Sequence, residues 1–193
     1  MVMRSDEELM ALYRRGSRDA FEELFARHHR KVIHFCYRMT GDQASAEEAA
    51  QEVFLRIARG AATYEPTAKF TTWMYTVARR TTLNFLRDEK DERDRAASTE
   101  ADDGEGASPL SRVPGPDSLN PEHMAWSAEL SARFVEALRE LPESHRSALV
   151  LNRGEGLSYE EVAAVLGVTV QAVKSRIFRA REMLLERLSG LLE

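Results

Sequence analysis

The segment 158–181 constrains the fold of this chain most, because it has the residue pattern of a helix-turn-helix. Its sequence is SYEEVAAVLGVTVQAVKSRIFRAR. Ser158 and Glu161 have the spacing of a capping box at the start of one helix, and Gly167 suits the left-handed residue that ends it. Thr169 is then placed to cap a second helix. We therefore predict two helices joined by a tight turn.

The second of these helices separates apolar from polar residues. At 100° per residue, one face collects Val170, Val173, Ile177, Ala180 and Leu184. The opposite face carries Gln171, Ser175, Phe178 and Arg179, with Lys174 at its edge. A solvent-facing phenylalanine beside arginine fits a DNA major groove, where apolar groups contact thymine methyls and arginine binds guanine. The alternative is a bundle in which Phe178 packs against a neighbouring helix.

Net charge, its distribution along the chain and the cysteine count restrict the functions that the protein can have. The formal net charge of −5 argues against a general polyanion binder. The acidic excess is local, however, because residues 91–126 carry 9 acidic and 3 basic side chains. Basic residues cluster at 79–87 and 174–181, as local DNA-binding faces require. The single cysteine, Cys36, excludes an intrachain disulfide and indicates a reducing compartment, with a buried structural thiol as its expected role.

The rest of the chain predicts an all-α protein of two helical domains. Residues 1–90 contain four helical patterns, interrupted at Thr40–Asp42 and by a loop around 64–67, and strand patterns are absent. Residues 91–121 are rich in Asp, Glu, Ser, Gly and Pro, which predicts a flexible acidic linker. Residues 122–193 form the second domain, which contains the helix-turn-helix.

No stretch approaches the roughly 18 apolar residues of a membrane span, and no signal peptide is visible at the start of the chain. We expect a cytoplasmic protein without direct membrane insertion. Catalytic motifs are also missing: there is no glycine-rich phosphate loop and no HExxH. His28 and His29 are adjacent and cannot share a helix face, so a zinc site is not expected. We predict no enzymatic activity and no cofactor.

Three runs of residues resemble bacterial RNA polymerase sigma factors. They are AEEAAQEVFLRI (46–57), FTTWMYTVARRTTLNFLR (70–87) and LPESHRSALVLNRGEGLSYEEVAAVLGVTVQAVKSRIFRARE (141–182). Their order, with only two domains, resembles the extracytoplasmic-function group. The resemblance implies a factor that binds core RNA polymerase, directs it to specific promoters and helps to open them.

The resemblance implies a role for each run. The first would bind the clamp coiled coil of the largest polymerase subunit through Glu47, Glu48, Gln51, Glu52, Phe54 and Leu55. The alternative for its acidic residues is a solvated helix face. The third would read the minus-thirty-five promoter element with Lys174, Ser175, Phe178 and Arg179, assisted by Gln171. Arg176 and Arg181 are better placed for phosphates, which position the helix without reading sequence.

The second run would melt and read the minus-ten element, because single-stranded bases stack on aromatic rings while cations follow the backbone. The candidates are Lys69, Trp73, Tyr75, Arg79, Arg80, Asn84 and Arg87, with the loop 61–69 as the wall of a base pocket. Phe70 and Val77 are expected in the core, whereas Trp73 and Tyr75 fit either role. Relatives often carry Asn at the position of Arg80, so its base preference is open, whereas Asn84 follows the usual pattern.

Two other functions are alternatives to that of a sigma factor. A helix-turn-helix regulator that binds DNA independently would carry a receiver or ligand-binding domain before its helix-turn-helix, and residues 5–90 show neither. A purely protein-binding helical module, such as an antagonist of sigma factors, would have no use for the two basic and aromatic clusters. The resemblance further implies an anti-sigma factor as a partner.

Overall fold

The computed structural model describes residues 4–66, 68–99 and 121–189, which are helical throughout apart from short connections. The first domain consists of α1 (Asp6–Arg14), α2 (Arg18–Thr40), α3 (Gln43–Gly60), a 3₁₀ turn (Ala61–Thr63) and α4 (Phe70–Thr99). The second consists of α5 (Pro121–Arg139), α6 (Glu143–Leu149), a π-helical turn (Val150–Gly154), α7 (Tyr159–Leu166) and α8 (Val170–Ser189). The predicted all-α class with two helical domains is confirmed.

Local sequence signals determine where the helices of the first domain begin and end. The Ser5 hydroxyl accepts a hydrogen bond from the amide of Glu8, whose carboxylate accepts one from the Ser5 amide in return. Helix α2 ends at Gly41, whose φ of 78° is left-handed. A side chain at Gly41 would also collide with the side chain of Arg139 in α5, so glycine makes room for this arginine.

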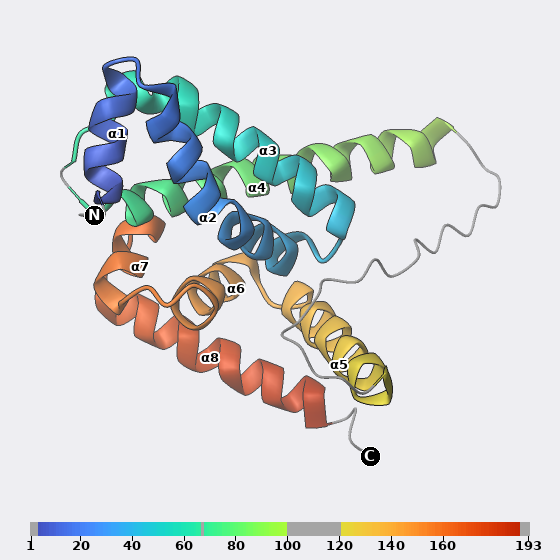
Figure 1. Cartoon of the computed structure of the whole chain (residues 1–193). Helices are drawn as coiled ribbons and strands as arrows, with labels where there is room; N and C mark the ends of the chain where they lie inside the picture. Colours follow the sequence, from blue (N-terminus) through green and yellow to red (C-terminus); the bar gives the residue numbers. More distant parts are fainter. Residues whose placement is uncertain (1–3, 67, 100–120, 190–193) are drawn as a thin grey trace.

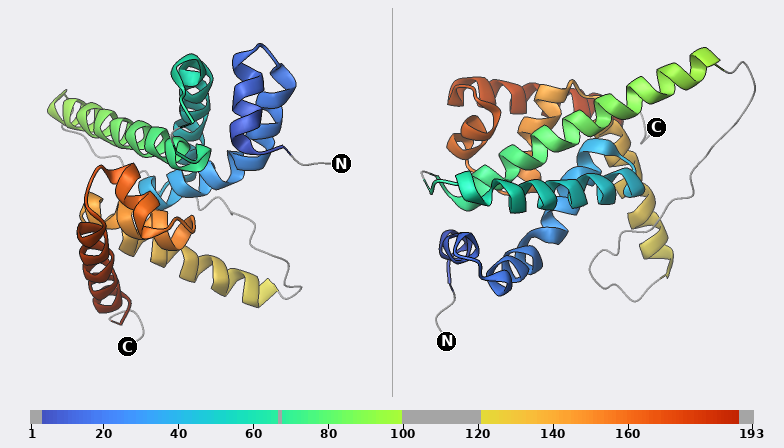
Figure 2. Two further views of the ribbon diagram at one scale, coloured as in Figure 1. Left: turned by 90° about the vertical axis from the view of Figure 1, so that its left-hand side faces the viewer. Right: turned by 90° about the horizontal axis from the view of Figure 1, so that it is seen from above.

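Helix α4 is longer than the sequence patterns suggested. It continues to Thr99, through the first nine residues of the segment that we predicted to be a linker. Glu92, Arg93 and Arg95 there are good helix formers, and Arg93 pairs with Glu89 one turn earlier. Figure 2 shows this end of α4 extending away from the body of the molecule. The rest of the predicted linker, 100–120, lies outside the described residues.

The core of the first domain forms where α2 packs against α3 and α4. Phe35, Met39 and Val53 are completely buried, and small residues of α3 such as Ala46 and Ala49 allow the helices to approach closely. Cys36 is also completely buried, and its Sγ atom lies 3.4 Å from the Thr82 hydroxyl. Burial raises the pKa of this thiol to about 11, and the predicted burial of Cys36 is confirmed.

The helix-turn-helix has the predicted local structure. Ser158 and Glu161 form the capping box of α7, and Gly167 ends that helix with a φ of 65°. The Thr169 hydroxyl accepts a hydrogen bond from the amide of Ala172 at the start of α8. The apolar face of α8 is buried against α6 and α7 through four residues that the periodicity predicted, which are Val173, Ile177, Ala180 and Leu184.

The two domains contact each other. Helix α4 packs on α7, and α2 packs on α5 and on the π-helical turn. Figure 1 shows the first domain above the second, with α8 on the side of the second domain that is turned away from the first. Among the described residues, no helix is long and apolar enough to cross a membrane.

Candidate nucleic-acid interface

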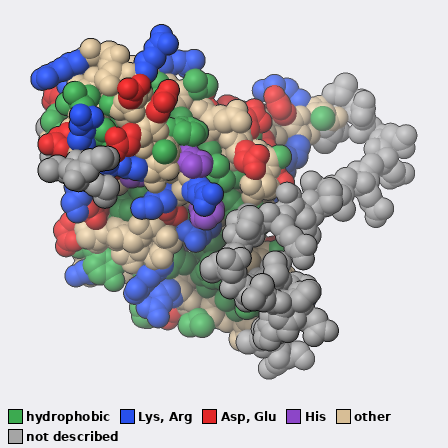
Figure 3. Space-filling view, in the orientation of Figure 1, with side chains coloured by type: hydrophobic (Ala, Val, Ile, Leu, Met, Phe, Trp, Pro, Cys, Tyr) green, Lys and Arg blue, Asp and Glu red, His purple; other side chains and the backbone are tan. Residues whose placement is uncertain are grey.

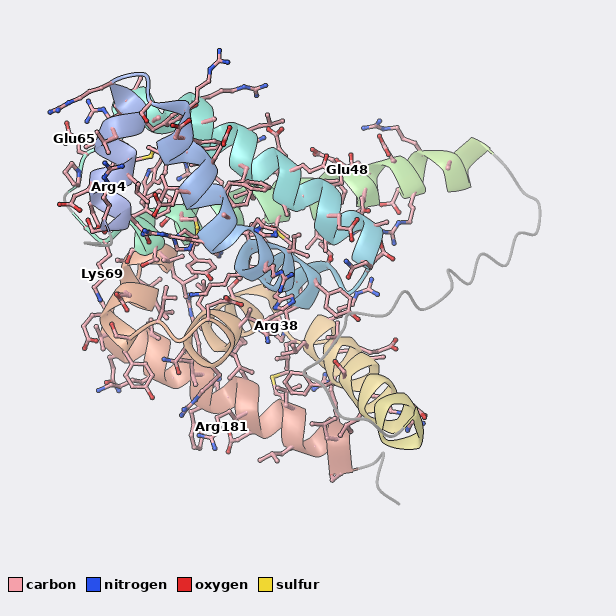
Figure 4. The ribbon with its side chains drawn as sticks, viewed as in Figure 1. Arg4, Arg38, Glu48, Glu65, Lys69 and Arg181 are labelled. Atoms are coloured by element: carbon pink, nitrogen blue, oxygen red, sulfur yellow. The ribbon has the colours of Figure 1, made fainter. Side chains whose placement is uncertain are left out.

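The outer face of α8 is open to solvent. Phe178 is 63% exposed, and the polar residues around it are also exposed, namely Gln171, Lys174, Ser175, Arg179 and Arg181, with Arg176 half-buried. Figure 3 shows Lys and Arg side chains over α8 at the lower edge of the molecule, and Figure 4 shows Arg181 directed away from the body. The alternative in which Phe178 packs against a neighbouring helix is therefore wrong for this structure.

The charge on this face changes along the helix. Its middle part lines a shallow open depression formed by Ser175, Phe178, Arg179, Glu182, Met183 and Glu186. The two glutamates at the far end repel phosphate. At the near end, burial and the charges of Arg176 and Arg179 lower the pKa of His145. Lys174, Arg176 and Arg179 lie in the first half of α8, whereas Glu182 and Glu186 lie in the second half, so the net positive charge is on the half where base contacts were predicted.

The aromatic residues at the start of α4 form one cluster. Phe70 is buried, as expected for a core residue, and Trp73 is half-buried. The Trp73 ring centre lies 4.9 Å from that of Tyr64 and 5.9 Å from that of Phe70. Trp73 thus packs against the α3–α4 connection while part of its ring stays accessible.

The sequence left open whether Tyr75 packs in the core or stacks on a base, and the structure places it in the core. It is 2% exposed, and its ring packs edge-on against Phe35. Its hydroxyl donates a 2.6 Å hydrogen bond to the carboxylate of Glu155, in the second domain. Burial raises the pKa of both side chains. The predicted base-stacking role of Tyr75 is not available in this arrangement, because no base can reach a ring buried between two domains.

Two of the predicted DNA-binding cations also contact the second domain. Arg79 donates from Nε and Nη2 to one carboxylate oxygen of Glu143, at 3.1 and 2.8 Å. The ammonium of Lys69 lies 2.9 Å from the carboxylate of Glu161, at the junction visible in Figure 4. The structure therefore places carboxylates where phosphates were expected.

The remaining candidates on α4 lie outside this contact. Arg80 and Arg87 are exposed, and Asn84 is half-buried. Arg87 donates a 3.2 Å hydrogen bond to the side-chain oxygen of Asn84, which shows that these two residues share one face of the helix. The predicted minus-ten residues thus divide into a covered group and an accessible group.

The predicted polymerase-binding face of α3 is exposed in its polar part. Glu47, Glu48 and Gln51 are exposed, and Figure 4 shows Glu48 on the outer side of α3. Glu52 pairs with Arg56 of the next turn at 2.7 Å. The two apolar candidates differ: Leu55 is 50% exposed, whereas Phe54 is buried and packs edge-on against Phe25. Leu55 is thus the better apolar anchor, and Phe54 supports the surface from beneath.

Comparison with known proteins agrees with both domains. Residues 24–92 match the family Sigma-70 region 2, and residues 131–184 match Sigma-70, region 4. The chain is 32% identical over 194 residues to the RNA polymerase sigma-H factor of Pseudomonas aeruginosa, covering 100% of this chain and 98% of that protein. It is 33% identical over 178 residues to the ECF RNA polymerase sigma factor SigW of Bacillus subtilis, covering 92% and 94%.

The chain belongs to the extracytoplasmic-function (ECF) sigma factors. It is a transcription initiation factor that directs RNA polymerase to promoters. The fold of this sigma factor is also similar to a solved structure, described as the sigma factor RpoE in complex with the anti-sigma factor NepR from Bartonella quintana. The TM-score is 0.64 at 24% identity, with 88% of this chain and 96% of that chain covered.

The sequence did not identify three acidic residues in the second domain of this sigma factor that contact the first domain. Glu143, Glu155 and Glu161 each bind a residue of the first domain, and Arg38 binds Glu155 at 2.9 Å. Glu161 was noticed only as a helix cap. Acidic residues on helix surfaces are too common to single out these three, so the sequence held no signal for the contact.

Proposed function

We propose that the two domains of this sigma factor divide promoter recognition between them. The second domain, residues 122–193, reads the minus-thirty-five element by placing α8 in the major groove. One observation carries this proposal: Phe178 is 63% exposed beside Arg179 on the outer face of the helix-turn-helix. Exposing a large apolar ring costs free energy in water, and contact with a thymine methyl relieves it.

The first domain, residues 1–90, reads and melts the minus-ten element with residues 70–87 of α4 and the preceding Lys69. Trp73 and the exposed cations Arg80 and Arg87 are accessible to a splayed strand as they stand. Lys69 and Arg79 reach phosphates only when their carboxylate partners leave. Promoter opening therefore requires the two domains to separate, a step that binding to polymerase would drive.

Binding to core polymerase uses the outer face of α3. Glu47, Glu48 and Gln51 supply an exposed polar surface, and Leu55 supplies an apolar contact at its edge. This face lies away from α8, so polymerase and the minus-thirty-five element can be bound at the same time (Figure 1).

The sigma factor contributes binding and strand separation, and the polymerase contributes the chemistry, so the chain itself is no enzyme and needs no cofactor. It acts in the cytoplasm, where core polymerase is found. An anti-sigma factor is a further partner, and the solved complex named above supports this assignment by analogy of fold.

A gel-shift experiment tests the proposal. Labelled promoter DNA is incubated with the chain alone, with core polymerase alone and with both. Near-neutral domains and an acidic linker oppose non-specific attraction to phosphates, so specific binding is expected only when both proteins are present. Tight, sequence-specific binding by the free chain at physiological salt would instead identify an independent regulator.

A further inference from the structure

Helix α1 contacts both ends of the α3–α4 connection, whose described residues are 61–66 and 68–69. Arg14 donates from Nη1 to the carbonyl of Tyr64 at 2.9 Å and from Nη2 to the carbonyl of Ala62 at 3.4 Å. At the other end, the Glu7 carboxylate accepts a 2.8 Å hydrogen bond from the amide of Phe70, the first residue of α4. One rigid helix thus holds the start and the end of the connection.

The spacing of the two residues explains how one helix does this. Glu7 and Arg14 are seven residues apart, which places them on the same face of α1, two turns and roughly 10 Å from each other. Leu9 anchors the opposite side of α1 in the core, and Met10, which lies between Glu7 and Arg14 on their own side of the helix, is also completely buried. The helix therefore cannot move without disturbing the domain, and it transmits that rigidity to the connection.

A second contact from α1 reaches the same region through α2. The Asp6 carboxylate lies 2.7 Å from Nε2 of His28, and the His28 ring packs against Phe70, with ring centres 5.5 Å apart. Asp6 also pairs with Arg27 at 2.9 Å. The first turn of α1 thus holds Phe70 by its backbone through Glu7 and by its ring through Asp6 and His28.

The connection needs such support, because it contains an unfavourable group. Tyr64 is 3% exposed, yet its hydroxyl has no hydrogen-bond partner among the described residues. Burying an unpaired hydroxyl disfavours this conformation. The hydrogen bond from Arg14 to the Tyr64 carbonyl offsets that cost, and the hydrogen bond of Glu7 lowers the pKa of its carboxyl group, so Glu7 stays ionised at neutral pH.

Tyr64 in turn positions Trp73. The Trp73 ring lies between Tyr64, 4.9 Å away between ring centres, and Gly60, where an added Cβ would be 3.4 Å from the ring. A shift of the connection would therefore rotate or release Trp73. This aromatic ring is the accessible base-stacking candidate on α4, so its orientation affects how a splayed base is bound.

We propose that Glu7 and Arg14 are positioning residues for minus-ten recognition: they fix the α3–α4 connection and, through Tyr64, the ring of Trp73. The proposal rests on the proposed role of the first domain in reading the minus-ten element. Neither residue needs to touch DNA. Their loss is expected to loosen base discrimination at the minus-ten element while leaving polymerase binding and minus-thirty-five recognition intact.

The first measurement does not depend on DNA. The chain has two tryptophans, so a Trp126→Phe background leaves Trp73 as the only fluorophore of its kind. Arg14→Ala is expected to raise acrylamide quenching of Trp73, and Arg14→Lys to raise it less, because lysine keeps the charge but not the two-pronged contact. Arg15→Ala is the matched control, since Arg15 is the exposed neighbouring arginine. Equal quenching in Arg14→Ala and Arg15→Ala would overturn the proposal.

The second measurement uses holoenzyme assembled from the full chain and core polymerase. Open-complex formation is compared on a promoter and on variants with single-base changes in the minus-ten element. Losing the contacts of a charged group is expected to reduce discrimination between them by about tenfold in Arg14→Ala. Glu7→Ala is expected to act similarly, and Glu7→Gln less, because its amide oxygen can still accept the hydrogen bond from Phe70.

The outcomes separate the proposal from the function on which it rests. A uniform loss on all promoters, or unchanged discrimination despite raised quenching, would overturn the positioning role alone. If wild-type holoenzyme showed no preference among minus-ten variants, the proposed reading of that element would fail, and the positioning role with it. Thermal unfolding of each variant shows whether the fold is kept, and Arg14→Lys decides the question if Arg14→Ala does not fold.

Discussion

The outer face of α8 and the covered part of α4 are both proposed to bind promoter DNA, but they are in opposite states. On α8, Phe178 and Arg179 are open to solvent and need no rearrangement. On α4, Tyr75 is buried against Glu155, and Arg79 is bound to Glu143. The difference indicates that the proposed minus-thirty-five face is exposed in the free chain, whereas part of the proposed minus-ten face becomes accessible only when the domains separate.

The physical reason is that water solvates the charged side chains on one face, whereas carboxylates of the second domain bind those on the other. The cations of α8 are on a convex outer surface, where water solvates them and DNA can replace the water. Lys69, Arg79 and Tyr75 lie on a surface that fits the second domain, and carboxylates satisfy their hydrogen bonds there. DNA must therefore compete with an intramolecular partner whose effective concentration is high.

The largest expected effect comes from removing Glu155, whose side chain is 4% exposed and accepts hydrogen bonds from both Arg38 and Tyr75. Glu155→Ala would leave the buried Tyr75 hydroxyl without its acceptor, which costs about 1–3 kcal/mol, and should therefore shift the equilibrium toward separated domains by about tenfold. Small-angle scattering should show a larger radius of gyration. The control is Glu160→Ala, which removes an exposed carboxylate from α7. Equal radii for the two variants would contradict the prediction.

The next effect concerns the face that is already open. Arg179→Ala should lower discrimination in the minus-thirty-five element by about 1–3 kcal/mol, the free energy of a bidentate base contact. Arg181→Ala should weaken all promoters alike, because a phosphate contact carries no sequence information. Run-off transcription on a panel of mutated promoters measures both. Identical profiles for the two variants would remove the distinction between base-reading and backbone-binding residues on α8.

The Arg179 effect should also be independent of domain separation. Arg179 and Glu155 have no partner in common among the described residues, so the two substitutions should combine additively to within about 0.5 kcal/mol. A double variant, Arg179→Ala with Glu155→Ala, tests this in the same transcription assay. Strong coupling would mean that the α8 face also depends on the contact between the domains.

A smaller effect is expected at Arg80, which lies on α4 but outside the covered group. Arg80→Asn should change the preferred base at one minus-ten position by about 1 kcal/mol, the lower end of the range for a base contact. Permanganate reactivity of melted thymines on single-base promoter variants measures it. If Arg80 only neutralises phosphate charge, Arg80→Lys will be nearly silent and Arg80→Asn will reduce opening equally on every promoter.

The smallest expected effect is a dependence of domain contact on pH. Burial raises the pKa of Glu155, so the contacting domains bind a proton at this site more tightly than the separated domains. Lowering the pH through that raised pKa should therefore favour contact, and raising it should favour separation. The pKa of Glu161 shifts in the opposite direction, because the hydrogen bond from Lys69 lowers it. The contribution of Glu161 to the contact between the domains is therefore lost only as the pH falls below the ordinary pKa of 4.5.

Sedimentation velocity from pH 8 to pH 5 measures this balance. The wild-type chain should become slightly more compact toward pH 5, because Glu155 is protonated before Glu161 loses its contribution. Glu155→Gln, which keeps the shape but cannot ionise, should lose this part of the pH dependence. A wild-type chain that expands as the pH falls would show that the Lys69–Glu161 contact dominates.

Much of the fold was predictable because its signals are local. Capping boxes at Ser5 and Ser158 and the left-handed glycines 41 and 167 act within a few residues, and helix periodicity placed Phe178 and Arg179 on an exposed face. The end of α4 was predicted less well. Its charged residues resemble those of a linker in composition, whereas their spacing supports a helix to Thr99.

The candidate site was predictable only in part, as the residues of α4 show. Periodicity places Tyr75 and Arg79 on one side of the helix, but it cannot say whether solvent, DNA or another domain covers that side. The partners of these residues, Glu155 and Glu143, are 80 and 64 positions away in the chain. No local pattern connects such positions.

The sequence by itself determined the helices, their caps, the helix-turn-helix and the residue types available for binding DNA, since these depend on the geometry of one or two helical turns. Only the tertiary structure decided which of those residues are free. It brought Glu155 between Arg38 and Tyr75, and it placed Glu7 and Arg14 at the two ends of the α3–α4 connection. Such contacts follow from how whole helices pack together, and they depend on the shape of the entire chain.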